Sequence, residues 1–444
     1  MTTLTKPQFN TELLNFLQRS PTPFHAVAVM RERLLAAGFV ELDEAQAWQV
    51  APRGRYFITR NGSSLIALRT AKRALTVDGL RMVGAHTDSP CLKLKPNAVL
   101  ESVGYVKFGV EVYGGVLLNP WFDRDLSLAG RVTLRDKRGV LLSRLIDCQR
   151  PLAIIPSLAI HLDREANEGR AINKQTMLPP VLGLAGDKPF DLGALLKHEL
   201  KKEHAALARA DILDFELSFY GTQAPALVGV NQEFIASARL DNLLSCYTGL
   251  QTLLDSKADT AQLFIASDHE EVGSNSAAGA RGNFLKSVLE RLAGGDEDYG
   301  RMIARSLLVS TDNAHGIHPN FADKHDHRHG PVLNRGPVVK VNSNQSYATN
   351  SESAALFKHA AAQAKAAVQA FVTRTDMGCG STIGPLTAAG LGVRTVDVGV
   401  PTFAMHSIRE LAGADDAHAL YRTLLAFFAM SDLTIDSRRS KQGS

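Results

Sequence analysis

An apolar run that ends in two adjacent glutamates constrains this chain more than any other segment. Residues 263–266 read Leu-Phe-Ile-Ala, and such a short run rich in strand-forming residues predicts a buried β-strand. Glu270 and Glu271 follow in a polar turn, at the end of the strand where open α/β sheets place their ligands. Adjacent carboxylates repel each other unless a cation lies near, so Glu271 would bind a metal while Glu270 moves a proton. An acidic, solvated turn explains this segment alone equally well.

Four other segments place a histidine or an acid beside an apolar stretch. His86 follows an apolar run, and Asp88 would accept the other ring N–H of that histidine and fix its tautomer. The remaining candidates are Asp241 before a helical pattern, Asp312 after a third predicted strand, and His406. Together with the second glutamate of the pair, they form a candidate set of metal ligands from five separate segments.

The chemistry of this set is specific, because two histidines and three carboxylates can hold two divalent ions if one carboxylate bridges them. Imidazole and carboxylate ligands suit Zn²⁺, and also Mn²⁺ or Co²⁺. Paired ions about 3.5–4 Å apart polarise a carbonyl and generate hydroxide at neutral pH. A nearby unligated carboxylate then acts as base toward water and as acid toward a leaving amine. Any one histidine is more often structural than a ligand, so the prediction rests on the conjunction.

Seven short motifs reach from one end of the chain to the other, and their combination is far more specific than any one of them. They are residues 20–27 (SPTPFHAV), 85–90 (AHTDSP), 119–126 (NPWFDRDL), 268–274 (DHEEVGS), 344–350 (NQSYATN), 379–385 (CGSTIGP) and 405–407 (MHS). With these motifs the chain resembles the aspartyl aminopeptidases, a family of dizinc metallopeptidases that remove N-terminal acidic residues from peptides. The resemblance covers nearly the whole length.

The resemblance implies a role for each candidate residue, and these roles agree with the chemistry inferred above. Glu270 is the general acid/base. Asp241 bridges two Zn²⁺ ions per subunit. The metal ligands as a set are His86, Asp241, Glu271, Asp312 and His406.

The resemblance also implies residues that contact the substrate. His161 would enter the active site of a neighbouring subunit and, with Asp88 and Glu270, complete the catalytic residues. Lys340 and Tyr347 would contact the acidic side chain of the substrate. A lysine inside an apolar run is costly to bury unpaired, which independently favours a ligand role for Lys340.

Composition excludes several other classes of function. With 49 basic and 45 acidic residues the net charge is +4, which gives no argument for nucleic acid or a membrane surface as partner. No run approaches the length of a membrane span, and the N-terminus lacks the apolar core of a signal peptide. Four scattered cysteines suit reduced thiols. A cytoplasmic protein is therefore expected.

The predicted fold is α/β, with a mixed, zinc-peptidase-like sheet flanked by helices. Two helices are expected in residues 8–38, and an amphipathic helix near the end of the chain. Strands and helices alternate from 241 onward, whereas residues 92–235 contain many short β-rich runs. We therefore expect a catalytic domain built from residues 1–91 and 236–444, with a β-rich oligomerisation domain inserted at 92–235. In the family the insertion serves dimerisation, and the dimers assemble into a tetrahedral dodecamer.

Two other functions are compatible with the same residues. A metal-dependent amidase or deacylase would hydrolyse small acyl amides, and an assembly protein would keep zinc for structure. The spare Glu270 argues against the second, because a structural zinc site is closed and needs no base. The histidine-rich residues 325–329 are too crowded for a closed tetrahedral site, which favours a solvated loop, although a pocket-lining role stays open.

Overall fold

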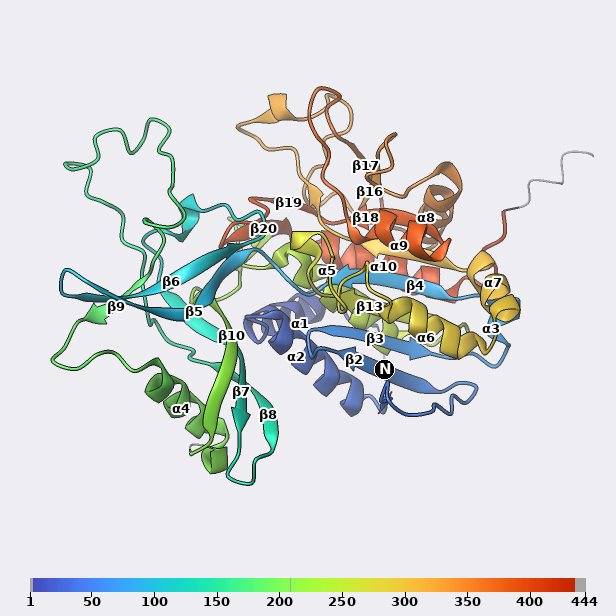
Figure 1. The fold of residues 1–444 in the computed structure, drawn as a ribbon. Coiled ribbons are helices and arrows are strands. Elements are labelled where there is room, and N and C mark those ends of the chain that lie inside the picture. The colour runs from blue at the N-terminus through green and yellow to red at the C-terminus, as the bar shows by residue number, and fades with distance from the viewer. Residues whose placement is uncertain (1–2, 208, 436–444) are drawn as a thin grey trace, which may run out of the picture.

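A computed structural model describes residues 3–207 and 209–435. Figure 1 shows a larger body that contains both ends of the described chain and a smaller, β-rich body beside it. The helices are Lys6–Gln18 (α1), Pro23–Ala36 (α2), Leu75–Asp78 (α3), Leu192–Glu203 (α4), Leu240–Asp255 (α5), Phe284–Ala293 (α6), Asp296–Ala304 (α7), Ser351–Gln363 (α8), Ile383–Leu391 (α9) and Asp416–Ala429 (α10). The two helices expected in residues 8–38 are α1 and α2, and the expected final helix is α10. Within the described ranges, no helix is long and apolar enough to cross a membrane.

A mixed nine-stranded sheet forms the centre of the larger body. In spatial order its strands are Val40–Glu41 (β1), Arg55–Arg60 (β2), Ser64–Arg69 (β3), Gln262–Ser267 (β13), Arg81–His86 (β4), Leu307–Thr311 (β14), Arg394–Gly399 (β18), Val338–Val341 (β16) and Gln369–Val372 (β17). The four central strands, β13, β4, β14 and β18, run parallel to one another. Because parallel strands end at the same edge, the residues that follow β13, β4 and β14 are brought together there.

Alternating side chains of these strands pack into two hydrophobic cores, one on each face of the sheet. On β4, Val83 and Ala85 belong to the core covered by α1, α2, α5, α8 and α10, whereas Met82 faces the core covered by α6 and α7. On β13, Phe264 packs into the first of these cores and Ile265 into the second. A strand buried on both faces reads as a continuous apolar run, which is the pattern that predicted β13.

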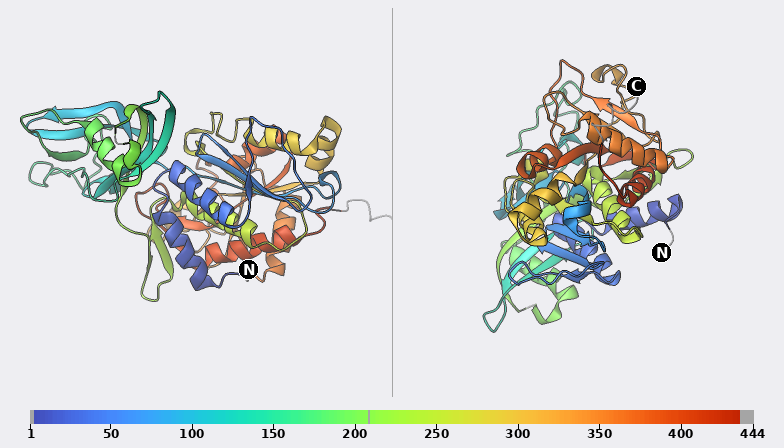
Figure 2. Two further views of the ribbon diagram at one scale, coloured as in Figure 1. Left: turned by 90° about the horizontal axis from the view of Figure 1, so that it is seen from below. Right: turned by 90° about the vertical axis from the view of Figure 1, so that its right-hand side faces the viewer.

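The smaller body, at the left of the first view in Figure 2, contains an antiparallel six-stranded sheet. In spatial order its strands are Leu141–Asp147 (β8), Leu126–Arg135 (β7), Asp211–Gly221 (β10), Cys91–Ser102 (β5), Tyr105–Tyr113 (β6) and Val181–Leu184 (β9). This sheet encloses a third core, against which α4 packs. Its strands all lie between residues 91 and 221, which is most of the predicted insertion.

A five-stranded sheet joins the end of the predicted insertion to the C-terminal part of the chain. Its strands, in order, are Ala226–Val228 (β11), Phe234–Ser237 (β12), Glu410–Gly413 (β20), Pro401–Phe403 (β19) and Ala314–His315 (β15). Residues 234–237 of β12 therefore pair with β20, which lies outside the range 92–235, and β11 joins the same sheet through β12. The division into two domains stays a proposal, and sheet membership favours an insertion that ends before β11.

Candidate metal centre

The five predicted ligands lie together at the carboxyl edge of the central parallel strands. Each is held by a different element of the larger body. His86 is the last residue of β4, Asp241 lies in the irregular first turn of α5, Glu271 lies in the 3₁₀ turn Glu270–Val272 after β13, Asp312 follows β14, and His406 lies between β19 and β20.

A first group of ligand atoms surrounds Nε2 of His86. This nitrogen lies 3.3 Å from Oδ1 of Asp241 and 3.6 Å from Oδ1 of Asp312. Ligand atoms of these three residues lie within 4.8 Å of one another, which places them around a common point. All three side chains are buried.

A second group surrounds Nε2 of His406. It lies 3.4 Å from Oε2 of Glu271 and 3.7 Å from Oδ2 of Asp241. Ligand atoms of this group also lie within 4.8 Å of one another. Asp241 belongs to both groups and directs one carboxylate oxygen toward each histidine, the arrangement that a bridging ligand between two ions requires.

The donor atoms of the two groups fit divalent cations. Oδ1 of Asp241 and Oε1 of Glu271 are buried and lack a hydrogen-bond partner among the described residues. Burial and the charge of Asp312 raise the pKa of Asp241, and burial and the charge of Asp241 raise the pKa of Glu271. Buried carboxylates without partners are costly, and positive ions placed between them would remove that cost. Nitrogen and oxygen donors of this kind suit Zn²⁺.

Both histidines direct Nε2 toward the centre and Nδ1 toward a main-chain carbonyl. Nδ1 of His86 lies 3.1 Å from the carbonyl oxygen of Asp88, and Nδ1 of His406 lies 3.0 Å from that of Gly115. Because a carbonyl only accepts, each Nδ1 carries the hydrogen and each Nε2 keeps a lone pair for a metal.

Asp88 was expected to accept the ring N–H of His86 through its side chain, but its main-chain carbonyl makes this hydrogen bond. The carboxylate of Asp88 lies 3.4 Å from Nδ1 of His86, whereas its carbonyl makes the hydrogen bond. The carboxylate instead accepts the main-chain N–H groups of Glu270 and Glu271, each at 3.1 Å. Asp88 therefore orients the glutamate pair as well as the histidine.

Glu270 stands apart from the ligands by distance and exposure. Its Oε2 lies 4.0 Å from Nε2 of His86, farther than Asp241 or Asp312, and its side chain is 16% exposed, against 4% for Glu271. Burial raises the pKa of Glu270 to about 8, and neighbouring carboxylates add to the rise. Glu270 also forms a third group with His86 and Glu271, so it lies within reach of the reacting groups.

Lys340 and Tyr347 lie beside the first group. The Lys340 ammonium donates to Oδ2 of Asp312 and to the carbonyl of Asn313, both at 3.2 Å, and lies 5.0 Å from the centre of the Tyr347 ring. The structure pairs this buried lysine with Asp312, a contact that its own segment of the sequence did not predict. Burial is the largest single influence and tends to raise the pKa of Asp312, but the neighbouring Lys340 and His86 together outweigh it and hold that pKa below its usual range.

His161 lies elsewhere, in a loop of the smaller body. Its side chain is exposed, and among the described residues no hydrogen bond or ion pair joins it to the five ligands. The structure of a single chain therefore does not bring His161 to the centre.

The histidine-rich tract folds into an irregular segment near the centre. His318 and His325, together with His315, line a pocket of about 320 Å³ that also includes Met405, the residue before His406. His329 contacts Asp326 at 2.7 Å instead. In the described ranges this tract contributes to none of the groups suited to a metal, and part of it has the pocket-lining position that the sequence left open.

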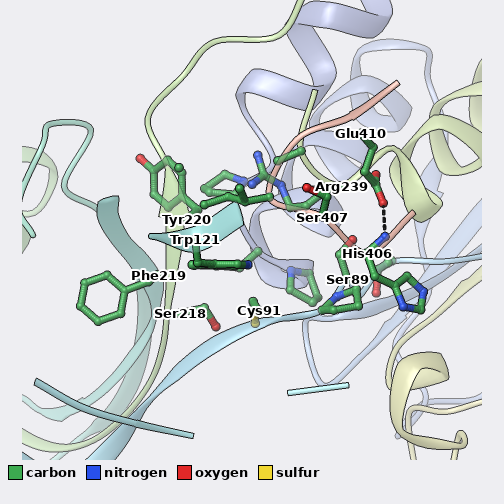
Figure 3. Close-up of a pocket in the computed structure, with 18 residues that line it drawn as sticks. Ser89, Cys91, Trp121, Ser218, Phe219, Tyr220, Arg239, His406, Ser407 and Glu410 are labelled. Carbon is green, nitrogen blue, oxygen red and sulfur yellow. Dashed lines mark hydrogen bonds between the residues drawn. The ribbon is translucent and has the colours of Figure 1, made fainter. Parts of the chain in front are cut away.

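Sequence reasoning missed Glu410, which joins two of the ligands. This buried carboxylate accepts the N–H of His406 at 2.7 Å (Figure 3). It also accepts the N–H of Asp241 at 3.0 Å. Burial raises its pKa to about 8. Glu410 also borders a cavity of about 30 Å³ behind His406, where the two bodies meet. It follows the Met-His-Ser motif by only three residues, but nothing in its own segment distinguishes it from a surface glutamate.

Comparisons with known proteins match this chain to one family of aminopeptidases. Residues 16–428 match the family described as aminopeptidase I zinc metalloprotease (M18). The chain is 58% identical over 425 residues to the probable M18 family aminopeptidase 2 of Pseudomonas putida (strain GB-1), covering 96% of this chain and 99% of that protein. It is 57% identical over 429 residues to the protein of the same description from Pseudomonas syringae pv. syringae (strain B728a), covering 96% and 100%.

Solved structures confirm the predicted α/β fold class. A cryo-EM structure of the Ape4 and Nbr1 complex matches with a TM-score of 0.91 at 39% identity, covering 96% of this chain and 86% of that chain. A crystal structure of prApe1 matches with a TM-score of 0.90 at 28% identity, covering 96% and 95%. The S. cerevisiae mApe1 dodecamer matches with a TM-score of 0.83 at 28% identity, covering 95% and 96%.

Proposed function

The chain belongs to the M18 family of zinc aminopeptidases, and from this premise we propose that it removes N-terminal aspartate and glutamate from peptides at a two-zinc centre. The observation that carries the proposal is the sharing of Asp241 between the groups around His86 and His406. Asp312 completes one group and Glu271 the other. Zn²⁺ is the metal of the family, and Mn²⁺ or Co²⁺ would suit the same donors.

The residues of this chain have distinct tasks in the proposed reaction. Two bound Zn²⁺ ions would polarise the scissile carbonyl and lower the pKa of water. Glu270 takes the proton of the attacking water and returns it to the leaving amine. The carboxylate of Asp88 holds the main chain at Glu270 and Glu271, so that the base and its neighbouring ligand keep their relative positions.

Lys340 supports a preference for acidic substrates. An ammonium group has three donors, and the described contacts use two of them, on Asp312 and on the carbonyl of Asn313. We propose that the third donor binds a substrate carboxylate beside the ring of Tyr347. Charge-assisted hydrogen bonds of this kind discriminate strongly between acidic and apolar side chains.

A test of the proposed specificity compares substrates that begin with Asp, Glu, Leu or Ala on the zinc-loaded enzyme. The wild type should prefer Asp and Glu. Lys340→Met should lower the Asp-to-Leu ratio of kcat/KM by about 10–100-fold, since hydrogen bonds to charged groups contribute about 1.5–3 kcal/mol. The ratio is the readout, because loss of the contact to Asp312 lowers turnover of every substrate.

Lys324→Met is the matched control, since Lys324 is an exposed lysine that lines the neighbouring pocket. It should leave the ratio unchanged. An unaltered Asp-to-Leu ratio in Lys340→Met would contradict the role proposed for Lys340. Equal rates with all four substrates in the wild type would contradict acidic specificity itself.

We also propose that the smaller body mediates assembly into dimers and a tetrahedral dodecamer, in which His161 donates a hydrogen bond to the developing oxyanion in a neighbouring subunit. His161 is exposed on the smaller body, which projects from the larger one, and this position suits the role. His161→Ala should lower kcat by about 10²–10³-fold, the usual effect of losing one oxyanion donor. Light scattering checks that the oligomer persists.

His198→Ala is the control, because it changes another exposed histidine of the same body, and it should retain activity. Full turnover by an assembled His161→Ala enzyme would exclude the role.

A further inference from the structure

The loop that leaves the six-stranded sheet after β6 reaches the candidate metal centre. Together with Tyr113, the last residue of β6, it comprises residues 113–117, and it contacts the centre at two separate points. One contact is made by the side chain of Tyr113 and the other by the main chain of Gly115. The smaller body thus approaches both halves of the centre within a few residues of its own sequence.

The first contact supports the glutamate pair. Oη of Tyr113 donates to Oδ2 of Asp88 at 2.7 Å. The same carboxylate accepts the main-chain N–H groups of Glu270 and Glu271. Tyr113 is itself held by the ammonium group of Lys93, which lies 4.0 Å from the centre of its ring. A rigid phenol therefore fixes the carboxylate that positions both glutamates.

The second contact supports His406. The carbonyl oxygen of Gly115 accepts the hydrogen on Nδ1 of His406, which leaves Nε2 directed toward Asp241 and Glu271. In return, the main-chain N–H of Leu117 donates to the carbonyl of His406 at 3.1 Å. The ring and the main chain of this one residue are thus held by the same loop.

The loop approaches the centre so closely that a larger residue at position 114 or 115 would require its neighbour to shift. A β-carbon on Gly115 would lie 3.2 Å from Nδ1 of His406. Gly114 has a φ of +70°, and a β-carbon on it would lie 3.1 Å from Cβ of Glu271. The left-handed backbone and the close approach both explain glycine at position 114.

We propose that residues 113–117 are a positioning element of the metal centre, through which the smaller body sets metal affinity and turnover in its own subunit. Tyr113 acts through Asp88 on the glutamate pair, and Gly115 acts on the tautomer and orientation of His406. Neither residue contacts the reacting atoms. The inference rests on the proposed two-metal centre, and groups that orient metal ligands typically contribute about 10–100-fold in affinity or activity.

The test measures Zn²⁺ binding to the full-length protein, freed of metal and titrated in competition with a chelating indicator. Tyr113→Phe removes one hydroxyl and keeps the ring. It should weaken binding of at least one Zn²⁺ about tenfold and, at saturating zinc, lower kcat with little change in KM. Tyr105→Phe is the matched control, because Tyr105 lies exposed at the opposite end of β6. It should behave as the wild type.

Gly115→Ala provides an independent variant at the second contact. The added methyl group should displace His406 and weaken one of the two Zn²⁺ sites about tenfold, while the other keeps its affinity. Gly183→Ala, where a β-carbon has no neighbour within 4 Å, is its control. Thermal unfolding of the metal-free proteins should agree between each variant and its control, which separates positioning from a loss of fold.

The outcomes distinguish this inference from the proposed function. A wild type that binds two Zn²⁺ and turns over substrate, with Tyr113→Phe and Gly115→Ala indistinguishable from their controls, overturns the inference alone. A wild type that binds no Zn²⁺ overturns the two-metal centre and the inference with it.

Discussion

Replacing Glu270 by glutamine should lower kcat by about 10²–10⁴-fold while the protein keeps both zinc ions. Glutamine preserves the size of the side chain, but its amide cannot take a proton from water and return it to an amine. Glu270 has the carboxylate farthest from Nε2 of His86 among the three around that histidine. Losing it should therefore affect proton transfer far more than ligation.

Glu271→Gln is the matched comparison, because the two glutamates are adjacent and share the support of Asp88. Glu271 lies 3.4 Å from Nε2 of His406 and belongs to the second group, so its variant should bind less zinc. Metal content by elemental analysis and kcat at saturating zinc separate the two roles. Substantial turnover in Glu270→Gln, or a loss of zinc equal to that of Glu271→Gln, would remove Glu270 from the role of acid/base.

Replacing Asp241 by asparagine should weaken the binding of both zinc ions by more than about 100-fold, since the loss of groups that merely orient ligands already costs about 10–100-fold. Asp241 is the residue common to the two groups and directs one oxygen toward each histidine. Substitution of any other predicted ligand should affect mainly one ion. Turnover should be undetectable at zinc concentrations that saturate the wild type.

The same variant should raise the stability of the metal-free protein. Burial and the charge of Asp312 raise the pKa of Asp241 in the folded state. A carboxyl group whose folded-state pKa is raised opposes folding once the pH exceeds its unfolded value, so a neutral isostere removes that penalty at pH 7. In the presence of a chelator, Asp241→Asn should unfold at a Tm at or above that of the wild type. Added zinc should raise the Tm of the variant less than it raises the Tm of the wild type. A lower metal-free Tm would contradict the destabilising charge of Asp241, and one zinc ion bound with full affinity would contradict the bridging role.

The sequence predicted the main elements of the larger body because their signals are local. The apolar run before Glu270 became β13, and the periodic pattern near the end of the chain became α10. It also predicted the five ligands, since histidines and acids next to apolar runs stand out at the ends of buried strands. Whether they bind zinc in solution is a matter for the experiments above.

Other features left no local signal. Glu410 occupies an ordinary position in a short strand, yet its carboxylate joins the main chain at Asp241 to that at His406. Lys340 was expected to contact the substrate, and only the packing of β16 near the end of β14 shows that it also contacts Asp312. Such contacts depend on the relative placement of distant segments, which periodicity and composition do not encode.

The amino-acid pattern by itself determined which side chains have the chemistry for a metal centre and roughly where the strands that carry them begin and end. Only the tertiary structure decided that Asp241 is common to two groups of ligands and that the six-stranded sheet sends Tyr113 and Gly115 to them. The physical reason is the separation along the chain of the residues that interact. Strand and helix formation follow from neighbouring residues, whereas the geometry of a site follows from packing between segments far apart in the chain.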